Sequence, residues 1–321
     1  MPKHVLTVTL NPAIDKIIKV KNFSVGRDFR SEDITLSAGG KGVNVSRVLK
    51  SLGRHSIATG FIGGTTGKYI KEELGKEKIQ NDFLEIRNET RTNLTILDQS
   101  THKITRVLEQ GPRITSFELK RFKNKFSSLL KNCSVVIFSG SIAPGLPESI
   151  YFELIKIAQK KNVKTVLDTS GKSLVLGLQA KPFLIKPNLE EAQYVLGKRV
   201  NSVSKIKDAI QRFPRLGIKI IILSLGEEGA VALNGKEIIK ATAPRLKCEN
   251  NVGCGDALLG GFITAQQKNQ NFKDSLRFAV ACGASNVLSI KPGLINPRVV
   301  KKLVKQIKIK DLSAFARKPR T

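Results

Sequence analysis

Short apolar runs alternate along the chain with segments of helical periodicity, and this alternation most limits the fold. Parallel strands that helices cover on both faces are typical of such a pattern. The strand candidates span residues 5–10, 57–61, 135–138, 165–167, 183–185 and 218–223. Between them, apolar residues recur at helical spacing over 45–52, 119–129 and 150–158. We therefore predict an α/β fold around a mostly parallel sheet.

Two excursions interrupt this alternation. Residues 14–20 with 29–36, and 92–97 with 103–108, alternate polar and apolar side chains like half-exposed antiparallel strands. We expect the excursions, about residues 12–37 and 90–110, to pair into a small second sheet. Because ligands bind at the carboxyl ends of parallel strands, a sheet placed there would act as a lid.

The composition excludes several classes of protein. A chain of 321 residues can form one large α/β domain or two smaller ones. Its apolar runs are far shorter than the ~20 residues of a membrane span, and the N-terminus is typical of a strand rather than a signal peptide. The four cysteines and three histidines lack metal-ligand spacing. We expect a reduced, cytoplasmic protein without a histidine-based metal site.

The net charge of +29 raises the alternative of nucleic-acid binding. However, the lysines are spread over the chain, aromatic residues make up only 6%, and tryptophan is absent. A lysine-rich proteome or a salt-adapted surface explains the charge better, so we do not expect nucleic acid as a partner. A basic field would also attract anionic phosphorylated substrates. The densest basic segment is 298–320, and residues 311–321 are predicted to form a disordered basic tail after a domain of residues 1–310.

The segment Asn251–Phe262 is the most informative for chemistry. Gly253, Cys254 and Gly255 predict a tight turn into a helix N-terminus, where free backbone N–H groups bind an anion. Asp256 would repel a phosphate there. It fits if it takes a proton from an alcohol while the N–H groups hold the phosphoryl group under attack. The alternative is that Asp256 only caps the helix.

Two common nucleotide motifs are absent. A dinucleotide fingerprint would need glycine in place of Leu258. A Walker loop at 62–69 would need glycine in place of Ile62 and Ser or Thr in place of Tyr69. A nucleotide would therefore have to bind through another architecture.

Further polar clusters follow the predicted strands. In Gly39-Gly40-Lys41, a glycine-rich turn opens a helix and Lys41 can reach an anion, although a plain turn is the alternative. Asn188 and Glu191 have the spacing of a capping box, which competes with any binding role. Residues 11–15, 139–147 and 224–229 are similar strand-end turns.

Together these motifs resemble the ribokinase-like carbohydrate kinases of the phosphofructokinase B branch. The resemblance runs from Val5 to about Ile309. The matching stretches are TLNPAID, GGKGVNVSRVLKSLG, TRTN, SGSIAPGLP, LDTSG, KPNLEE, SLGEEGA and NVGCGDALLGGF. It implies an α/β sandwich with a β-sheet lid, and transfer of the γ-phosphoryl group of ATP to a sugar hydroxyl.

The resemblance also implies roles for individual residues. Asp256 would be the catalytic base, with Gly253, Cys254 and Gly255 as the anion hole. The remaining residues fall into three sets. Substrate binding would involve Asp15, Gly39, Gly40, Lys41, Asn44, Arg91 and Ser139. Nucleotide binding would involve Lys186, Ser224, Gly226 and Gly229. Mg²⁺ would be ordered through water and phosphate by Asn188 and Glu191.

Lys41 and Arg91 match positions that hold the substrate's own phosphate, which favours a phosphorylated ketohexose. Fructose 1-phosphate is the first expectation, tagatose 6-phosphate the second and fructose 6-phosphate the third. The family often pairs its lids, so we predict a homodimer joined through the lid. Cys254 departs from the family's usual alanine. A thiol at an anion hole could have a lowered pKa and be open to oxidation, or could be a small buried filler.

Overall fold

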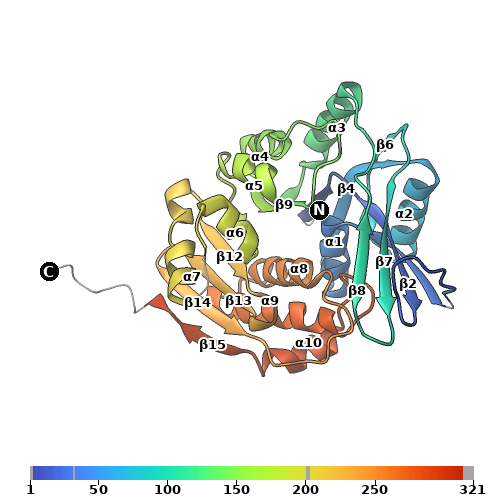
Figure 1. The fold of residues 1–321 in the computed structure, drawn as a ribbon. Helices are drawn as coiled ribbons and strands as arrows, with labels where there is room; N and C mark the ends of the chain where they lie inside the picture. The colour runs from blue at the N-terminus through green and yellow to red at the C-terminus, as the bar shows by residue number, and fades with distance from the viewer. Residues whose placement is uncertain (1–2, 32, 200–202, 314–321) are drawn as a thin grey trace.

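The computed structural model describes residues 3–31, 33–199 and 203–313. Figure 1 shows a central sheet with helices on both of its faces and a smaller sheet at one side. The main sheet has the order β15-β14-β13-β12-β11-β10-β9-β1-β4-β5, with β6 also paired to β4. Its strands are β1 (His4–Thr9), β4 (Ser56–Gly63), β5 (Gln80–Asn81), β6 (Leu84–Ile86), β9 (Cys133–Ser139), β10 (Lys164–Asp168), β11 (Leu184–Ile185), β12 (Ile220–Ser224), β13 (Ala230–Asn234), β14 (Glu237–Thr242) and β15 (Lys308–Asp311).

The predicted parallel sheet is confirmed. The six predicted strands are β1, β4, β9, β10, β11 and β12, and each pairs with its neighbour in parallel. Their register aligns the carboxyl ends at one edge, as the pairs Asp168↔Ser139 and Thr9↔Gly60 show. The polar clusters after these strands therefore meet at a single edge.

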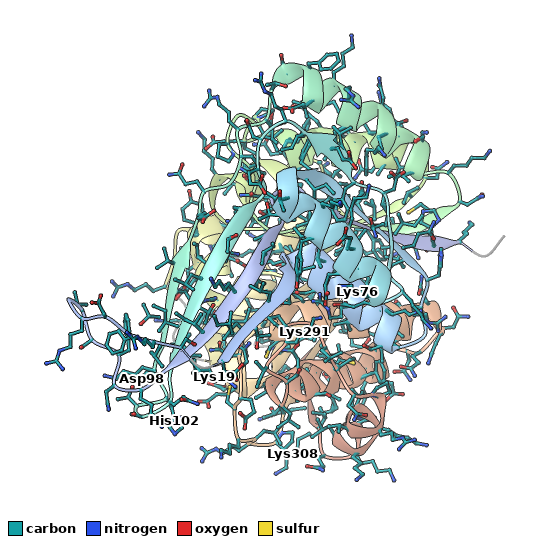
Figure 2. All side chains as sticks on the ribbon, turned by 90° about the vertical axis from the view of Figure 1, so that its right-hand side faces the viewer. Lys19, Lys76, Asp98, His102, Lys291 and Lys308 are labelled. Carbon is teal, nitrogen blue, oxygen red and sulfur yellow. The ribbon has the colours of Figure 1, made fainter. Side chains whose placement is uncertain are left out.

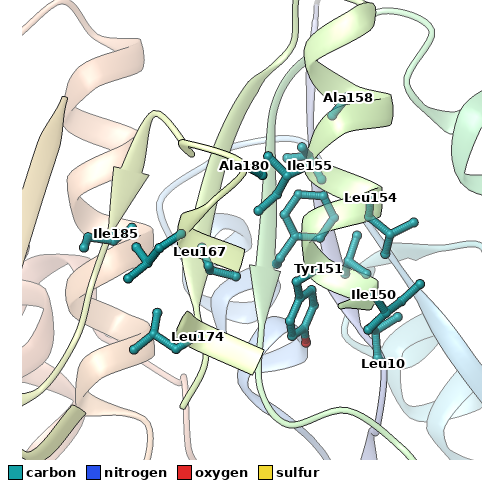
Figure 3. Close-up of a cluster of buried hydrophobic side chains, with 14 of the residues drawn as sticks. Leu10, Ile150, Tyr151, Leu154, Ile155, Ala158, Leu167, Leu174, Ala180 and Ile185 are labelled. Carbon is teal, nitrogen blue, oxygen red and sulfur yellow. The ribbon is translucent and has the colours of Figure 1, made fainter. Parts of the chain in front are cut away.

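The helices are α1 (Lys41–Ser51), α2 (Gly64–Lys76), α3 (Ser116–Leu129), α4 (Ile150–Lys160), α5 (Gly171–Leu178), α6 (Leu189–Leu196), α7 (Val203–Ile210), α8 (Cys254–Gln267), α9 (Phe272–Val287) and α10 (Pro297–Val304). Side chains of α1, α8, α9 and α10 pack on one face of the sheet and those of α3 to α7 on the other. Val5 and Leu6 of β1 enter opposite clusters, as the two-residue period of a strand requires. Figure 3 shows part of the cluster on the face covered by α3 to α7, which includes Tyr151 of α4, Leu167 of β10 and Leu174 of α5.

The C-terminal third differs from the expectation. Strands β13, β14 and β15 extend the sheet in antiparallel fashion and were not predicted. The boundary of the tail was also placed too early. Asp311 pairs with Ile239, and Leu312 is buried against the core, so the folded domain reaches at least Ser313. The rest of the predicted tail, 314–321, lies outside the described residues.

The predicted lid is present as a four-stranded sheet in the order β3-β2-β7-β8. Its strands are β2 (Ala13–Val20), β3 (Asp33–Gly39), β7 (Arg91–Asp98) and β8 (Ile104–Leu108). The central pair, β2 and β7, is parallel rather than antiparallel. This follows because β2 continues from β1 and β7 from β6, and both leave the same edge of the main sheet. Figure 2 shows Lys19, Asp98 and His102 together at the far end of the lid.

No helix in the described part of the chain is long and apolar enough to cross a membrane.

Candidate active site

Asp256 lies in the first turn of α8, which begins after Gly253 in a left-handed conformation with φ of 83°. Gly253 occupies the N-cap position and Asp256 is the third residue of the helix, so the interpretation of Asp256 as the N-cap is wrong. Instead, its Oδ2 accepts a hydrogen bond of 2.8 Å from Nδ2 of Asn44 in α1. Only 5% of Asp256 is exposed. The carboxylate is therefore held by a residue that is distant in the sequence.

The environment of Asp256 suits a general base. Burial, and next the negative charge of Asp168, raise its pKa to about 6, although Lys41, Asn44 and Lys186 act in the opposite direction. Such a base is ionised at neutral pH, yet its pKa is close enough to the working pH for efficient proton transfer. The backbone beside it is tightly placed, because a Cβ on Gly255 would lie 3.2 Å from the Lys186 ammonium.

Asp168 is a residue of the candidate site that sequence reasoning missed. It ends β10 and is 1% exposed. Its Oδ1 lies 3.2 Å from Nζ of Lys186 and 3.4 Å from Nζ of Lys41. Burial alone would raise its pKa, but the two ammonium groups outweigh burial and hold the pKa below its usual value. The available signal was an aspartate at the end of a buried strand, within the LDTSG stretch.

Lys41 stands at the start of α1 and joins the same cluster. Besides Asp168, its Nζ lies 3.8 Å from Oε1 of Glu191. The negative charge of Asp168 is the largest cause of a raised pKa, so Lys41 is protonated at neutral pH. Ser139 is fully buried, and its hydroxyl donates to Oδ2 of Asp168 over 3.4 Å. The predicted substrate contact of Ser139 stays a prediction, since its hydroxyl faces Asp168 here.

Asn188 and Glu191 form a capping box at the start of α6, which confirms the capping interpretation. The Asn188 side chain accepts from the Glu191 N–H at 2.8 Å, and the Glu191 carboxylate accepts from the Asn188 N–H at 2.9 Å. Ser224 bridges to Asn188 and its backbone N–H donates to Pro187 at 3.0 Å. The predicted nucleotide residues thus meet at the ends of β11 and β12.

The turn 224–229 that follows β12 is closed by glycines. Gly226 begins a 3₁₀ turn with φ of 61°, and Gly229 has φ of 88°. A Cβ on Gly229 would lie 2.1 Å from the Ala241 carbonyl oxygen, so a side chain has no room there. The turn leads into the β12–β13 hairpin at the ligand edge of the sheet.

On the lid, Asp15 faces the glycine turn before α1. Its Oδ1 accepts from Nδ2 of Asn93 at 3.0 Å, and a Cβ on Gly39 would lie 2.1 Å from its Oδ2. Gly40 has φ of 111°, and its added Cβ would lie 2.7 Å from Thr9. Burial raises the pKa of Asp15. The two glycines therefore create the space that this carboxylate occupies.

Several polar atoms under the lid lack partners. The Arg91 guanidinium donates to the carbonyl oxygens of Glu109 at 2.7 Å and Asn11 at 2.9 Å, but its buried Nε has no partner. The buried side-chain oxygens of Thr9, Asn11 and Asn93 have none either. Because unpaired buried polar atoms are costly, they indicate a place where a polar ligand binds.

Lys41 and Arg91 are held by different groups. Lys41 lies with Asp168 and Glu191 on the side of the predicted nucleotide residues, whereas Arg91 lies on the lid beside Asp15. Their joint role around one substrate phosphate stays a prediction.

Cys254 does not have the lowered pKa considered above. Burial raises the pKa of its thiol to about 11, and its Sγ accepts from Nδ2 of Asn286 at 3.4 Å. The thiol is therefore protonated at neutral pH, which fits a small filler at the start of α8.

Within 3–31, 33–199 and 203–313, no group of three or more His, Cys, Asp or Glu side chains could hold a metal ion. Asn188 and Glu191 are already committed to each other. Their predicted contact with Mg²⁺ through water and nucleotide phosphate stays a prediction.

Known proteins resemble this chain in both sequence and fold. The family model of pfkB carbohydrate kinases matches residues 8–298. This chain belongs to the pfkB carbohydrate kinase family. A tagatose-6-phosphate kinase of Staphylococcus epidermidis is 35% identical over 308 residues, covering 95% of this chain and 99% of that protein. A 1-phosphofructokinase of Borreliella burgdorferi is 35% identical over 309 residues, covering 96% and 99%.

The solved structure of phosphofructokinase-2 from Escherichia coli has a TM-score of 0.88 at 24% identity, covering 95% of this chain and 99% of that one. At that identity it shows the fold alone. The predicted family and ribokinase-like fold are thus confirmed, and as a pfkB kinase the protein is a phosphotransferase that acts on an alcohol group.

Proposed function

We propose that this enzyme transfers the γ-phosphoryl group of ATP to a hydroxyl of a ketohexose phosphate. The observation that carries the proposal is Asp256, a buried carboxylate with a pKa of about 6 that faces two ammonium groups. Fructose 1-phosphate, giving fructose 1,6-bisphosphate, is the preferred substrate and tagatose 6-phosphate the alternative. Relatives with both names match at 35% identity. The activity would take place in the cytoplasm, where free cysteines such as the four in this chain stay reduced.

Asp256 would act first. Its free Oδ1 takes the proton of the attacking hydroxyl while Oδ2 stays bonded to Asn44. The hydroxyl oxygen then bonds to the γ-phosphorus as the bond from that phosphorus to ADP breaks. The N–H groups of residues 253–255, at the positive end of α8, stabilise the charge on the transferring oxygens. Such transfer depends mainly on positioning and charge.

Lys186 and Lys41 would neutralise phosphate charge. Both ammonium groups contact Asp168 at the end of β10, so Asp168 would position Lys41 at the start of α1 and Lys186 after β11. Mg²⁺, when bound with ATP, would supply further charge neutralisation on the phosphates, with Asn188 and Glu191 as its indirect holders. Ser224, Gly226 and Gly229 would line the adjacent nucleotide site.

The lid would bind the sugar phosphate. Asp15, Asn11 and Asn93 offer one carboxylate and unpaired amide oxygens to sugar hydroxyls. Arg91 and Lys41 would contact the phosphate that the substrate already carries. Closing of the lid would then bring the hydroxyl to Asp256 and exclude water.

We also propose that the lid joins two copies of the chain. Strand register places Ile18, Ile34, Leu36, Leu94, Ile96 and Val107 on the side opposite Asp15. We call these six residues the outer lid face. Ile34 is 54% exposed and Val107 is 56% exposed. An apolar face of this kind favours a partner surface, and a two-fold symmetric dimer would cover it.

A coupled assay that measures ADP formation tests the activity. Purified enzyme with Mg-ATP is given fructose 1-phosphate, tagatose 6-phosphate or fructose 6-phosphate, with fructose as the unphosphorylated control. We expect the highest kcat/KM with fructose 1-phosphate and a far lower value with fructose. If none of the three sugar phosphates supports ATP consumption, the proposal is wrong.

A further inference from the structure

Arg47 is a buried cation that is joined to the proposed catalytic base through Asn44, and the mechanism above does not use it. It lies in α1, three residues after Asn44, and is 3% exposed. The sequence did not single it out, because an arginine on an amphipathic helix usually faces solvent. Its burial beside the site requires an explanation, since unpaired charges are rarely buried.

All five N–H donors of Arg47 are used. Nε and one N–H of Nη2 donate to the Glu77 carboxylate at 2.7 and 3.2 Å. The other Nη2 donor reaches the Ala38 carbonyl at 2.9 Å, and Nη1 reaches the Pro292 carbonyl at 2.8 Å. The last donor, also on Nη1, reaches Oδ1 of Asn44 at 3.1 Å. Lysine could not replace this planar set, because its three donors share one atom.

The contact with Asn44 fixes which way its amide points. Arg47 has only donors, so the amide must present its oxygen to the guanidinium. The amide nitrogen then faces Asp256 and donates to Oδ2 at 2.8 Å. If the amide turned over, its oxygen would face a carboxylate oxygen, which is repulsive when Asp256 is charged.

We propose that Arg47 is a positioning residue for Asp256 and acts by locking the Asn44 amide in the orientation that supports the charged carboxylate. This inference rests on the proposed role of Asp256 as the base. Arg47 also ties together the end of β3 through Ala38, the helix α1, and the loop after α9 through Pro292. The orientation of the base is thereby linked to the segment where the lid joins the glycine turn.

The proposal predicts a change in pH dependence. The charged groups around Asp256 are Asp168 from β10, Lys41 from α1 and Lys186 after β11, with the Cys254 thiol two residues away. Replacing Arg47 leaves all four in place. Arg47→Lys keeps a positive charge and mainly weakens the hydrogen-bond chain that favours charged Asp256, so the pKa of Asp256 should rise. Arg47→Met also removes a positive charge that acts on Asp15 and Glu77. Because the base works deprotonated, the acidic limb of the kcat profile should move to higher pH.

The test compares Arg47→Lys and Arg47→Met with wild type in kcat–pH profiles at saturating substrates. We expect the acidic limb to move to higher pH by roughly one unit, so that kcat at low pH falls about tenfold. The KM for ATP should change little. Glu77→Gln is the matched control, because it weakens the ion pair of Arg47 but leaves the contact with Asn44. It should lower stability without moving the limb. An equal shift in Glu77→Gln, or no shift in the Arg47 variants, would overturn the proposal.

A double-mutant cycle covers the case in which Arg47→Met does not fold. If Arg47 acts through Asn44, then Arg47→Lys should move the limb no further in an Asn44→Ala background. Additive shifts would instead show an independent structural effect. A ¹³C-carboxyl NMR titration gives the pKa of Asp256 without any substrate, with Asp256→Asn assigning the signal. The role of Arg47 can therefore be tested even if the enzyme does not phosphorylate any ketohexose phosphate. Conversely, full activity of Asp256→Asn would remove the proposed base itself.

Discussion

The catalytic centre and the lid prepare for ligands in opposite ways. At the centre, Asp168, Lys41 and Lys186 are paired with one another, and Asp256 is bonded to Asn44. Under the lid, Asn11 and Asn93 keep unpaired buried oxygens, and the outer lid face exposes apolar side chains. The centre is thus organised before binding, whereas the lid has polar and apolar surfaces that need a ligand or a partner. Preorganised charge favours the transition state, and an unsatisfied lid favours closure on substrate.

The largest effect should follow removal of the base at the organised centre. Asp256→Asn keeps the shape and the neighbour Asn44 but cannot accept the proton. We expect kcat to fall ~10²–10⁴-fold while the KM for the sugar phosphate changes little. Steady-state kinetics measure both. Activity within a few-fold of wild type would mean that the centre does not work through this carboxylate.

On the lid, the effect should fall on substrate binding instead. Arg91→Ala removes a charge-assisted contact worth roughly 1.5–3 kcal/mol, so the KM for the sugar phosphate should rise about 10- to 100-fold. The KM for ATP should stay close to wild type. Lys41→Ala is the informative companion, because Lys41 lies with Asp168 and Glu191. If Lys41→Ala raises mainly the KM for ATP, the predicted pairing of Lys41 and Arg91 on one phosphate is wrong.

The sequence alone predicts one part of this site but not another. The strand ends, the lid excursions and the turn before Asp256 follow from local pattern, so the site edge was predictable. The contacts of Asp256 with Asn44, and of Lys41 with Asp168, join residues 212 and 127 positions apart. No local pattern encodes such a distance. Asp168 and Arg47 were therefore missed, although each stands in a stretch that was noticed.

The antiparallel strands β13–β15 were missed for a related reason. The alternation of apolar runs and helical periods favours βα units. However, β12 to β14 form consecutive hairpins, and β15 comes from the far end of the chain. An edge strand with alternating lysines, Lys308 and Lys310, resembles an exposed tail by composition alone. Only pairing with β14 shows it to be part of the sheet.

Asp168→Asn tests how far the centre depends on its internal charges. The negative charge of Asp168 raises the pKa of Asp256, so its removal should lower that pKa below about 6. The acidic limb of kcat should then move to lower pH, by roughly one unit, opposite to the Arg47 variants. The two ammonium groups lose their partner, and the free energy of unfolding should fall by about 3–5 kcal/mol. Urea unfolding and pH profiles measure the two effects, and a limb that moves upward would contradict this electrostatic account.

The smallest expected effect is a twofold change in the mass of the particle in solution. It tests whether the outer lid face joins two copies of the chain. Val107 belongs to the outer lid face, whereas Ile104 lies on the opposite side of the same strand, β8. Val107→Glu should convert a dimer into a monomer in light scattering at micromolar concentration, because a buried unpaired charge opposes association. Ile104→Glu carries the same charge on the inner side and should leave the dimer intact. A wild-type protein that is monomeric with and without sugar phosphate and ATP would mean that the outer lid face is not a subunit interface. The contrast between the catalytic centre and the lid would then weaken. The outer lid face would contact no partner, and because it lies on the side opposite Asp15 it would not contact the substrate.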